Sequence, residues 1–298
     1  MGEPRTVSSP DRGRTIILGH TGFLGRALQD YLVTQGVAVH GYSSKTLDLR
    51  SSDALRALDP HVGPDTTLIV AAALTPDKGV TLDALADNFA MVANVARYLE
   101  AHAVRKCVYF SSDAVYPFGA EPVSERSAAD PENFYALAKF VGERVLRRAA
   151  EAQGFPVLVV RPTGVYGPGD THNSYGPNRF VRSIVRERTV RLFGKGTERR
   201  DHLYVGDFCR IVGVLSASEV DGVVNLATGS SRSFASIVDA LRALVPYEFS
   251  VVSLPQRTPV THRRFDVTRL CEALPGVHFT PFEEGLEATF AAAAGQPT

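Results

Sequence analysis

The feature that most constrains the fold is a regular alternation of short apolar runs with helical patterns in the first half of the chain. The runs occupy residues 15–19, 37–42, 67–73, 105–112 and 157–162, and they end at Gly, Pro or Ser. Candidate helices lie between them at 23–35, 51–58, 81–102 and 134–153. Runs that are apolar on both faces indicate parallel strands covered by helices on both sides. A further short strand is predicted at 47–49.

The alternation loosens after residue 163, where a stretch rich in Gly, Pro and Asn predicts a loop. Helices are expected at 179–187, 207–217, 233–244 and 282–294, and short strands near 190–193, 223–227 and 249–254. We therefore predict an α/β chain with a doubly wound parallel sheet of the Rossmann type over 14–163, to which later segments return. Residues 164–298 are expected to form mainly a smaller, interleaved substrate-binding lobe, and 1–13 a flexible leader.

The composition restricts which binding partners and which cellular compartment we expect for the protein. The 298 residues include 32 basic and 32 acidic side chains, and a protein without basic excess is a poor candidate for binding nucleic acid or a membrane surface. No apolar stretch is long enough to span a membrane, and the first 14 residues lack the apolar core of a signal peptide. The three cysteines, Cys107, Cys209 and Cys271, show no metal-ligand spacing. We expect no metal and a reducing, cytoplasmic compartment.

Three glycines follow the first apolar run and open the first candidate helix. Gly19, Gly22 and Gly25 are spaced GxxGxxG, whereas the common dinucleotide fingerprint is GxGxxG. Glycine permits a tight turn and a close approach of the backbone to a pyrophosphate, which the N-terminus of a helix attracts. A plain tight turn is the alternative, but the position after the first strand favours a dinucleotide site.

The end of the second run bears on which dinucleotide is bound. Sites selective for NAD usually carry an acidic residue here, which holds the ribose 2′-hydroxyl. This chain instead has Ser43, Ser44 and Lys45. Hydroxyls and an ammonium group suit a 2′-phosphate, which favours NADP(H) over NAD(H). The alternative is a solvated polar turn.

Tyr135 and Lys139 stand four residues apart, so their side chains can share one face of a helix. Taken alone, the pair could equally be an ordinary surface pair. Ser112 ends the preceding apolar run, and parallel sheets present their ligand sites at the ends of strands. A cation beside a tyrosine lowers its pKa from about 10, so the grouping suits proton transfer.

Six segments together resemble the extended short-chain dehydrogenase/reductase family, which acts mostly on nucleotide-diphosphate sugars. They are GHTGFLG, FSSDAVYP, YALAK, RPTGVYGPGD, RRDHLYVGDF and RRFDVTRL, and the resemblance covers nearly the whole chain. Two branches are most similar, the GDP-fucose synthases and the dTDP-4-dehydrorhamnose reductases. Both reduce 4-keto-6-deoxy sugar nucleotides with NADPH.

Two positions depart from other branches of that family. Ala114 stands where 4,6-dehydratases carry Glu and GDP-fucose synthases carry Cys, which argues against dehydration and against 3,5-epimerisation. Gly164 stands where many 4-epimerases carry Asn. The resemblance therefore implies an NADPH-dependent 4-ketoreductase. An NDP-sugar 4-epimerase with tightly bound NAD is the nearest alternative, and a non-catalytic dinucleotide-binding sensor is the alternative from another class.

The resemblance also assigns roles to residues. It implies that Tyr135 transfers the proton, that Lys139 tunes Tyr135 and holds the nicotinamide ribose, and that Ser112 hydrogen-bonds the reacting oxygen. Asp113 either assists the proton transfer, orients the sugar or caps a turn. Besides Tyr135 and Lys139, the expected cofactor contacts are Gly19, Thr21, Gly22, Phe23, Leu24, Gly25, Ser43, Ser44, Lys45, Asp48, Leu49, Ala71, Ala72, Ala73 and Pro162.

Substrate contacts are expected from the second half of the chain. Arginines bind a diphosphate well through paired hydrogen bonds. Arg200 matches the family's diphosphate contact, and Arg263 or Arg264 is expected to act likewise, unless these are solvated surface charges. Asn178 and Arg179 are expected near the diphosphate or the sugar, and His172 is either polar surface or a second acid. The helices at 81–102 and 134–153 are expected to form a homodimer interface.

Overall fold

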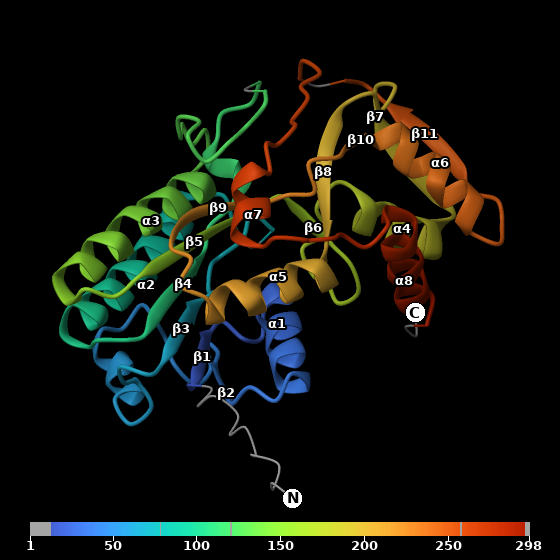
Figure 1. Cartoon of the computed structure of the whole chain (residues 1–298). Helices are drawn as coiled ribbons and strands as arrows, with labels where there is room; N and C mark the ends of the chain where they lie inside the picture. Colours follow the sequence, from blue (N-terminus) through green and yellow to red (C-terminus); the bar gives the residue numbers. More distant parts are fainter. Residues whose placement is uncertain (1–12, 78, 120, 257, 296–298) are drawn as a thin grey trace, which may run out of the picture.

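The computed structural model describes residues 13–77, 79–119, 121–256 and 258–295, so the predicted leader falls almost wholly outside the described residues. Within the described part, six parallel strands form the larger sheet in the order β2-β1-β3-β4-β5-β9 (Figure 1). Their bounds are β1 (Thr15–Leu18), β2 (Val39–Tyr42), β3 (Thr67–Val70), β4 (Lys106–Phe110), β5 (Val157–Pro162) and β9 (Gly222–Leu226).

Helices cover both faces of this sheet, as Figure 1 shows. On one face lie α2 (Leu82–Ala101) and α3 (Phe134–Gln153), and on the other α1 (Phe23–Thr34), α5 (Val205–Ala217) and α7 (Thr268–Ala273). Successive residues of a strand point to opposite faces, so Ile16 joins the core under α2 and α3 while Ile17 joins the core under α1 and α5. The predicted α/β class with a doubly wound parallel sheet is confirmed.

The strand order creates a crevice at the carboxyl edge of the sheet. From β1 the chain first moves outward to β2, and then returns to place β3 on the other side of β1. Loops that leave β1 and β3 therefore diverge in opposite directions. Open α/β sheets bind their ligands at such a switch point.

In the residues that the structure describes, the second lobe contains two small sheets and three helices. One sheet has the order β10-β8-β6, the other pairs β11 with β7. The lobe is built around a core that includes Phe180, Ile237 and Leu286. Its elements are β6 (Gly164–Tyr166), α4 (Pro177–Glu187), β7 (Thr189–Phe193), β8 (Arg199–Tyr204), β10 (Ser231–Ser233), α6 (Phe234–Leu244), β11 (Ser250–Leu254) and α8 (Phe282–Ala294).

The two lobes are interleaved along the chain. After β8, the chain returns to the larger lobe as α5 and β9, and β9 pairs with β5. It then crosses again, since β10 pairs with β8. In Figure 1 the segment between α7 and α8 likewise runs from one lobe to the other.

Two local predictions are wrong. Residues 47–49 form no strand, because Leu47 and Leu49 are buried in the core under α2 without a neighbouring strand. Their i, i+2 spacing imitates a strand. Residues 51–58 form only a 3₁₀ helix, η1 (Asp53–Leu58).

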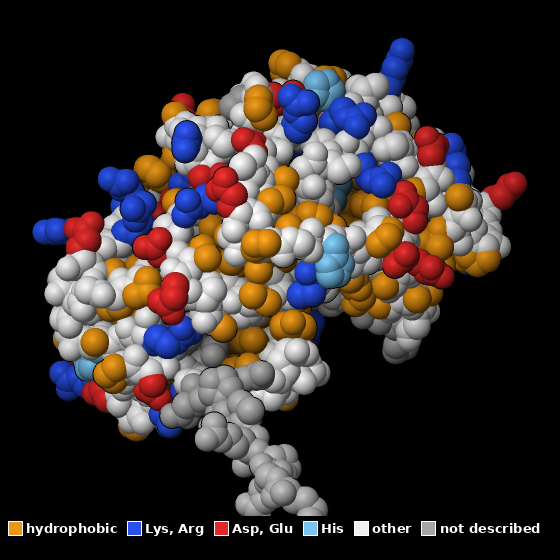
Figure 2. Space-filling model, in the orientation of Figure 1, with side chains coloured by type: hydrophobic (Ala, Val, Ile, Leu, Met, Phe, Trp, Pro, Cys, Tyr) orange, Lys and Arg blue, Asp and Glu red, His pale blue; other side chains and the backbone are white. Residues whose placement is uncertain are grey.

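The face of the molecule shown in Figure 2 has no large patch of one charge sign. Figure 2 shows basic and acidic side chains intermixed over both lobes, as the balanced composition predicts. No helix in the described part of the chain is long and apolar enough to cross a membrane. Cys107, Cys209 and Cys271 are all free thiols.

Candidate active site

The turn between β1 and α1 is built for a close approach of backbone atoms. Gly19 has a φ of +95°, and a Cβ there would lie 2.7 Å from the backbone of Ala72. A Cβ on Gly25 would lie 2.3 Å from the Gly19 carbonyl oxygen, whereas one on Gly22 would come no closer than 3.5 Å. The first turn of α1 carries no acidic side chain, and its leading N–H groups have no partner within the helix. The turn thus fits an anion such as a pyrophosphate.

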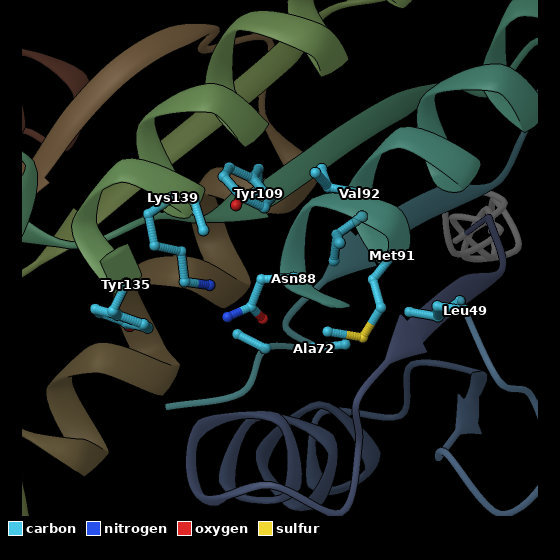
Figure 3. Close-up of a pocket in the computed structure, with 11 residues that line it drawn as sticks. Leu49, Ala72, Asn88, Met91, Val92, Tyr109, Tyr135 and Lys139 are labelled. Carbon is cyan, nitrogen blue, oxygen red and sulfur yellow. The ribbon is translucent and has the colours of Figure 1, made fainter. Parts of the chain in front are cut away.

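A pocket beside this turn lies between α2, α3 and the end of β3 (Figure 3). Five predicted residues line it: Leu49, Ala72, Ala73, Tyr135 and Lys139. Its remaining walls, which the sequence did not reveal, are Val70, Asn88, Met91, Val92, Tyr109 and Ala138.

Asn88 of α2 fixes the loop that follows β3. Its Oδ1 accepts from the Leu74 N–H at 2.7 Å, and its Nδ2 donates to the Leu74 carbonyl at 3.0 Å. The side chain is 8% exposed. A buried amide with both ends used in this way holds the wall of the pocket in one position.

The start of α3 sets the positions of Tyr135 and Lys139. Asn133 caps the helix, because its Oδ1 accepts from the Ala136 N–H at 2.9 Å. Tyr135 therefore lies in the first turn, and both side chains project from α3 toward the pocket in Figure 3. Lys139 is 4% exposed, and its Nζ donates to the Phe110 carbonyl at 2.7 Å. The same Nζ lies 5.7 Å from the centroid of the Tyr135 ring.

The expected effect of Lys139 on Tyr135 is wrong for this structure. Burial raises the pKa of Tyr135 to about 12, and the Asp113 carboxylate adds to the rise, while a hydrogen bond with Ser112 opposes it. The Lys139 ammonium does not offset the effect of burial on the Tyr135 pKa. Burial therefore favours the protonated phenol at Tyr135.

Lys139 itself is shifted in the opposite sense. Burial lowers its pKa to about 8, and the charge of Glu143 partly opposes that shift. The side chain remains mainly an ammonium at neutral pH and can donate to a ligand.

Ser112 and Asp113 come next to Tyr135 from the end of β4. Ser112 caps the short 3₁₀ helix η2 (Asp113–Val115), and its Oγ accepts from the Ala114 N–H at 3.1 Å. The Asp113 carboxylate pairs with Arg263 at 3.2 Å. Burial raises the pKa of Asp113, while Arg263 pulls it down. The structure thus brings Ser112, Asp113, Tyr135 and Lys139 together.

A buried ion pair supports these residues and was not predicted. Arg161 of β5 donates to both carboxylate oxygens of Glu143, at 2.8 and 2.5 Å, and Ser111 also donates to Glu143. Both charged side chains are at most 5% exposed. Glu143 lies one turn after Lys139 on α3, and this spacing is the one signal that sequence reasoning could have used.

The end of β2 offers polar groups for the far end of a dinucleotide. Ser43 is buried, while Ser44 and Lys45 are exposed. Asp48 does not fit its expected contact, because Arg50 binds both of its oxygens at 3.0 and 2.8 Å and holds the pKa of its carboxyl at about 2.

The other expected cofactor contacts occupy different environments. Thr21 is exposed at the turn, and Pro162 is buried at the end of β5. Ala71, Phe23 and Leu24 pack with the core beneath α1.

Of the expected substrate residues, Arg179, Arg200 and Arg264 keep some access to solvent. Arg179 and Arg264 are exposed. Arg200 is 21% exposed and is held by Glu198 at 2.6 Å and by the Thr261 carbonyl at 2.7 Å. These guanidinium groups can still bind an anion.

Asn178 and Arg263 do not fit the expected substrate contact. Asn178 is 6% exposed, donates to Asp170 at 2.7 Å and accepts from the Gly167 N–H at 3.1 Å. Both ends of its amide thus hold the loop that precedes α4. Arg263 is 3% exposed and is bonded to Asp113 and to the loop after it. Both side chains stabilise the protein around the site.

His172 lies over the start of α1. Its Nδ1 is 3.2 Å from both Thr75 Oγ1 and Asp77 Oδ1, and its ring packs edge-on against Phe23 with centroids 6.3 Å apart. These contacts place the histidine beside the loop after β3 and the first residue of α1. No three metal-binding side chains gather anywhere in the described residues.

Comparisons with known proteins show sequence and fold similarity over most of the chain. The profile of the NAD-dependent epimerase/dehydratase family matches residues 15–227. The probable GDP-L-fucose synthase 1 of Oryza sativa subsp. japonica is 26% identical, over 93% of this chain and 91% of that protein. The UDP-glucose 4-epimerase of Mycolicibacterium smegmatis is 27% identical, over 93% of this chain and 97% of that protein. The solved structure of MoeE5 in complex with UDP-glucose and NAD is 26% identical with a TM-score of 0.80, over 94% of this chain and 98% of that one.

Proposed function

The chain belongs to the NAD-dependent epimerase/dehydratase family, and on that premise we propose that it is an NADPH-dependent 4-ketoreductase of a nucleotide-diphosphate 4-keto-6-deoxysugar. One observation carries the proposal: the half-buried Tyr135 phenol stands beside Ser112 and Lys139 at the mouth of a dinucleotide-type crevice. Reduction of a ketone needs a proton donor at that place.

The residues of the crevice fit a dinucleotide. The backbone around Gly19, Gly22 and Gly25 would hold the pyrophosphate, and Lys139 would hold the nicotinamide ribose. When bound, the nicotinamide supplies the hydride.

The proton on the product oxygen comes from Tyr135. A phenol with a pKa of about 12 keeps its proton at neutral pH and gives it up only to a more basic oxygen, such as the one that forms as a carbonyl is reduced. The Ser112 hydroxyl is placed to donate a hydrogen bond to the same oxygen. Lys139, bonded to the Phe110 carbonyl, keeps positive charge near the forming alkoxide.

The polar end of β2 supports NADPH as the preferred cofactor. Exposed Ser44 and Lys45 can hydrogen-bond a 2′-phosphate, and the carboxylate of nearby Asp48 is neutralised by Arg50. On the substrate side, Arg200 and Arg179 are the groups that we propose for the diphosphate.

A 4-epimerase is the second candidate, because one relative is a UDP-glucose 4-epimerase. Epimerisation begins with oxidation of a hydroxyl, for which Tyr135 would act as the base, so the catalytic residues suit both reactions. Gly164 offers no side chain where many 4-epimerases carry Asn. This difference favours the reductase.

We also propose a homodimer that forms through α2 and α3. Phe89 of α2 and Leu137 of α3 are 47% and 36% exposed, and Leu82 and Phe134 extend this apolar surface. The free cysteines suit a reducing, cytoplasmic compartment, and the mixed surface charge gives no basis for a nucleic-acid partner.

The test is turnover of GDP- and dTDP-linked 4-keto-6-deoxyhexoses with NADPH, preceded by native mass spectrometry of the purified protein. A reductase consumes NADPH as the sugar is converted. A 4-epimerase consumes no NADPH, carries NAD through purification and inverts C4 of the corresponding 4-hydroxy sugar nucleotide, because the 4-ketone itself has no configuration at C4. A non-catalytic sensor binds a dinucleotide but converts no sugar.

A further inference from the structure

Arg263 is a buried cation that joins the segment before α7 to the loop after β4. Its Nη1 donates to the Asp113 carboxylate at 3.2 Å and to the Asp113 carbonyl at 3.0 Å. Its Nη2 donates to the carbonyls of Tyr116 and Pro117, at 2.9 and 3.1 Å. The neighbouring Arg264 is exposed. One buried guanidinium therefore fixes both the backbone and the side chain at Asp113.

Asp113 retains capacity to bind a further group. A carboxylate has about four acceptor positions, and here one oxygen accepts from Arg263 while the other lies 3.4 Å from the Ser112 hydroxyl. The side chain is 22% exposed, in contrast to the 3% of Arg263. The carboxylate thus presents acceptor positions next to the group that holds the reacting oxygen.

The charged and titratable groups around Asp113 are Arg263, Arg200 and Tyr135. The two cations favour the carboxylate form, while burial opposes it. Paired with the Arg263 guanidinium, the carboxylate acts as a hydrogen-bond acceptor.

We propose that Asp113 accepts a hydrogen bond from a hydroxyl on the carbon next to the reacting carbonyl, and that Arg263 is the positioning residue that aims it. The proposal rests on the proposed function, since it takes Ser112 to bind the carbonyl oxygen. The oxygens of a carbonyl and of a hydroxyl on the adjacent carbon lie about a hydrogen-bond length apart. A group next to Ser112 is therefore placed to reach the second oxygen.

The consequence is a preference for α-hydroxy ketones. A hydrogen bond to a charged acceptor, when it is lost, lowers kcat/KM by about tenfold to a hundredfold. We expect that ratio between a 4-keto-6-deoxyhexose nucleotide and its 3-deoxy analogue with the wild-type protein.

The experiment compares both substrates in four proteins: wild type, Asp113→Asn, Arg263→Met and Arg264→Met. The GDP- and dTDP-linked forms of each sugar are used with NADPH. We expect Asp113→Asn and Arg263→Met to reduce the preference for the hydroxylated substrate to a few-fold, while Arg264→Met keeps it. Equal losses on the two substrates in Asp113→Asn would overturn the proposal, as would a preference that survives Arg263→Met.

The pH profile distinguishes an Arg263 that orients the Asp113 carboxylate from an Arg263 that only stabilises the fold. Without the Arg263 cation, burial should raise the pKa of the Asp113 carboxyl further, because Arg263 is the main group that lowers it. In Arg263→Met we expect the acid limb of kcat/KM for the hydroxylated substrate to move to higher pH, and the limb for the 3-deoxy substrate to stay. Identical shifts for both substrates would contradict the aiming role.

Measurements of sugar-nucleotide binding test the proposal even if the protein reduces no sugar. Calorimetry with the NADPH-loaded protein compares a nucleotide-linked 6-deoxyhexose with its 3-deoxy analogue. Discrimination that disappears in Asp113→Asn supports the proposal although the reductase assignment has failed. Equal affinity of the wild-type protein for both sugars refutes it.

Discussion

Replacement of Gly25 and of Gly22 by alanine should have very different effects, although both glycines belong to the same turn. A Cβ on Gly25 would lie 2.3 Å from the Gly19 carbonyl oxygen and 3.1 Å from the His20 Cα. The obstacles are backbone atoms, so the first turn of α1 or the turn after β1 must move. At Gly22 the nearest atom is at 3.5 Å and φ is −73°, which any residue adopts.

The expected sizes follow from this geometry. Inserting a methyl group into a close-packed site costs about 1–3 kcal/mol, which is about a five- to 150-fold change in an equilibrium constant at 1.4 kcal/mol per factor of ten. We expect Gly25→Ala to lose that much affinity for NADPH or that much unfolding free energy. For Gly22→Ala we expect changes within about 0.5 kcal/mol.

Fluorescence titration with NADPH measures the affinity, and urea unfolding measures the stability of both variants. The two measurements together show whether the strain appears in the folded protein or only when the pyrophosphate must be accommodated. If Gly25→Ala binds NADPH and unfolds like the wild type, the steric reasoning about the turn is refuted. A larger loss in Gly22→Ala than in Gly25→Ala would refute it as well.

Three further predictions concern charges. The pKa of Lys139 is about 8 and its ammonium is the active form, so kcat/KM should fall above about pH 8. Lys139→Arg should move this alkaline limb of the pH profile to higher pH. A pH series in which the limb does not move contradicts the prediction. The unfolded chain protonates His202 below pH 6.5 but the folded protein only below about 4, so stability falls as pH drops through that window. At 1.36 kcal/mol per pH unit, about 2 kcal/mol is lost by pH 5, and urea unfolding should show a smaller loss in His202→Asn. Lys45→Glu should lower the ratio of kcat/KM for NADPH over NADH, and an unchanged ratio excludes Lys45 from the 2′-phosphate site.

The central sheet could be predicted because its signal is local. Four-residue strands such as Thr15–Leu18 are buried on both faces, so their apolar character marks them directly. The glycine turn is partly local, since the positive φ of Gly19 and the contact between Gly25 and Gly19 involve neighbours in the chain, whereas the close approach of Gly19 to Ala72 does not.

Elements that combine charge and burial escaped prediction. Strand β8 reads Arg-Arg-Asp-His-Leu-Tyr, yet Asp201 and His202 are buried, because threonine hydroxyls and backbone groups from distant segments satisfy Asp201. No pattern within the strand reveals those partners.

The roles of individual side chains also depend on the tertiary structure. Arg263 and Arg264 are adjacent and chemically identical, but the bridge between Val123 and Phe265 turns one toward the core and the other toward solvent. The spacing of Tyr135 and Lys139 correctly implied a shared helix face, while the direction of the Tyr135 pKa shift was decided by burial and by the Asp113 carboxylate.

The most direct test of the central claim is the stoichiometry of NADPH oxidation during conversion of a 4-keto-6-deoxyhexose nucleotide, measured with the wild-type protein and with Tyr135→Phe. We predict one NADPH oxidised per sugar converted, and a kcat about 10²–10⁴-fold lower in the variant, with its affinity for NADPH retained. Conversion without NADPH consumption, or full turnover by Tyr135→Phe, would contradict the assignment of Tyr135 as the proton donor of a reductase.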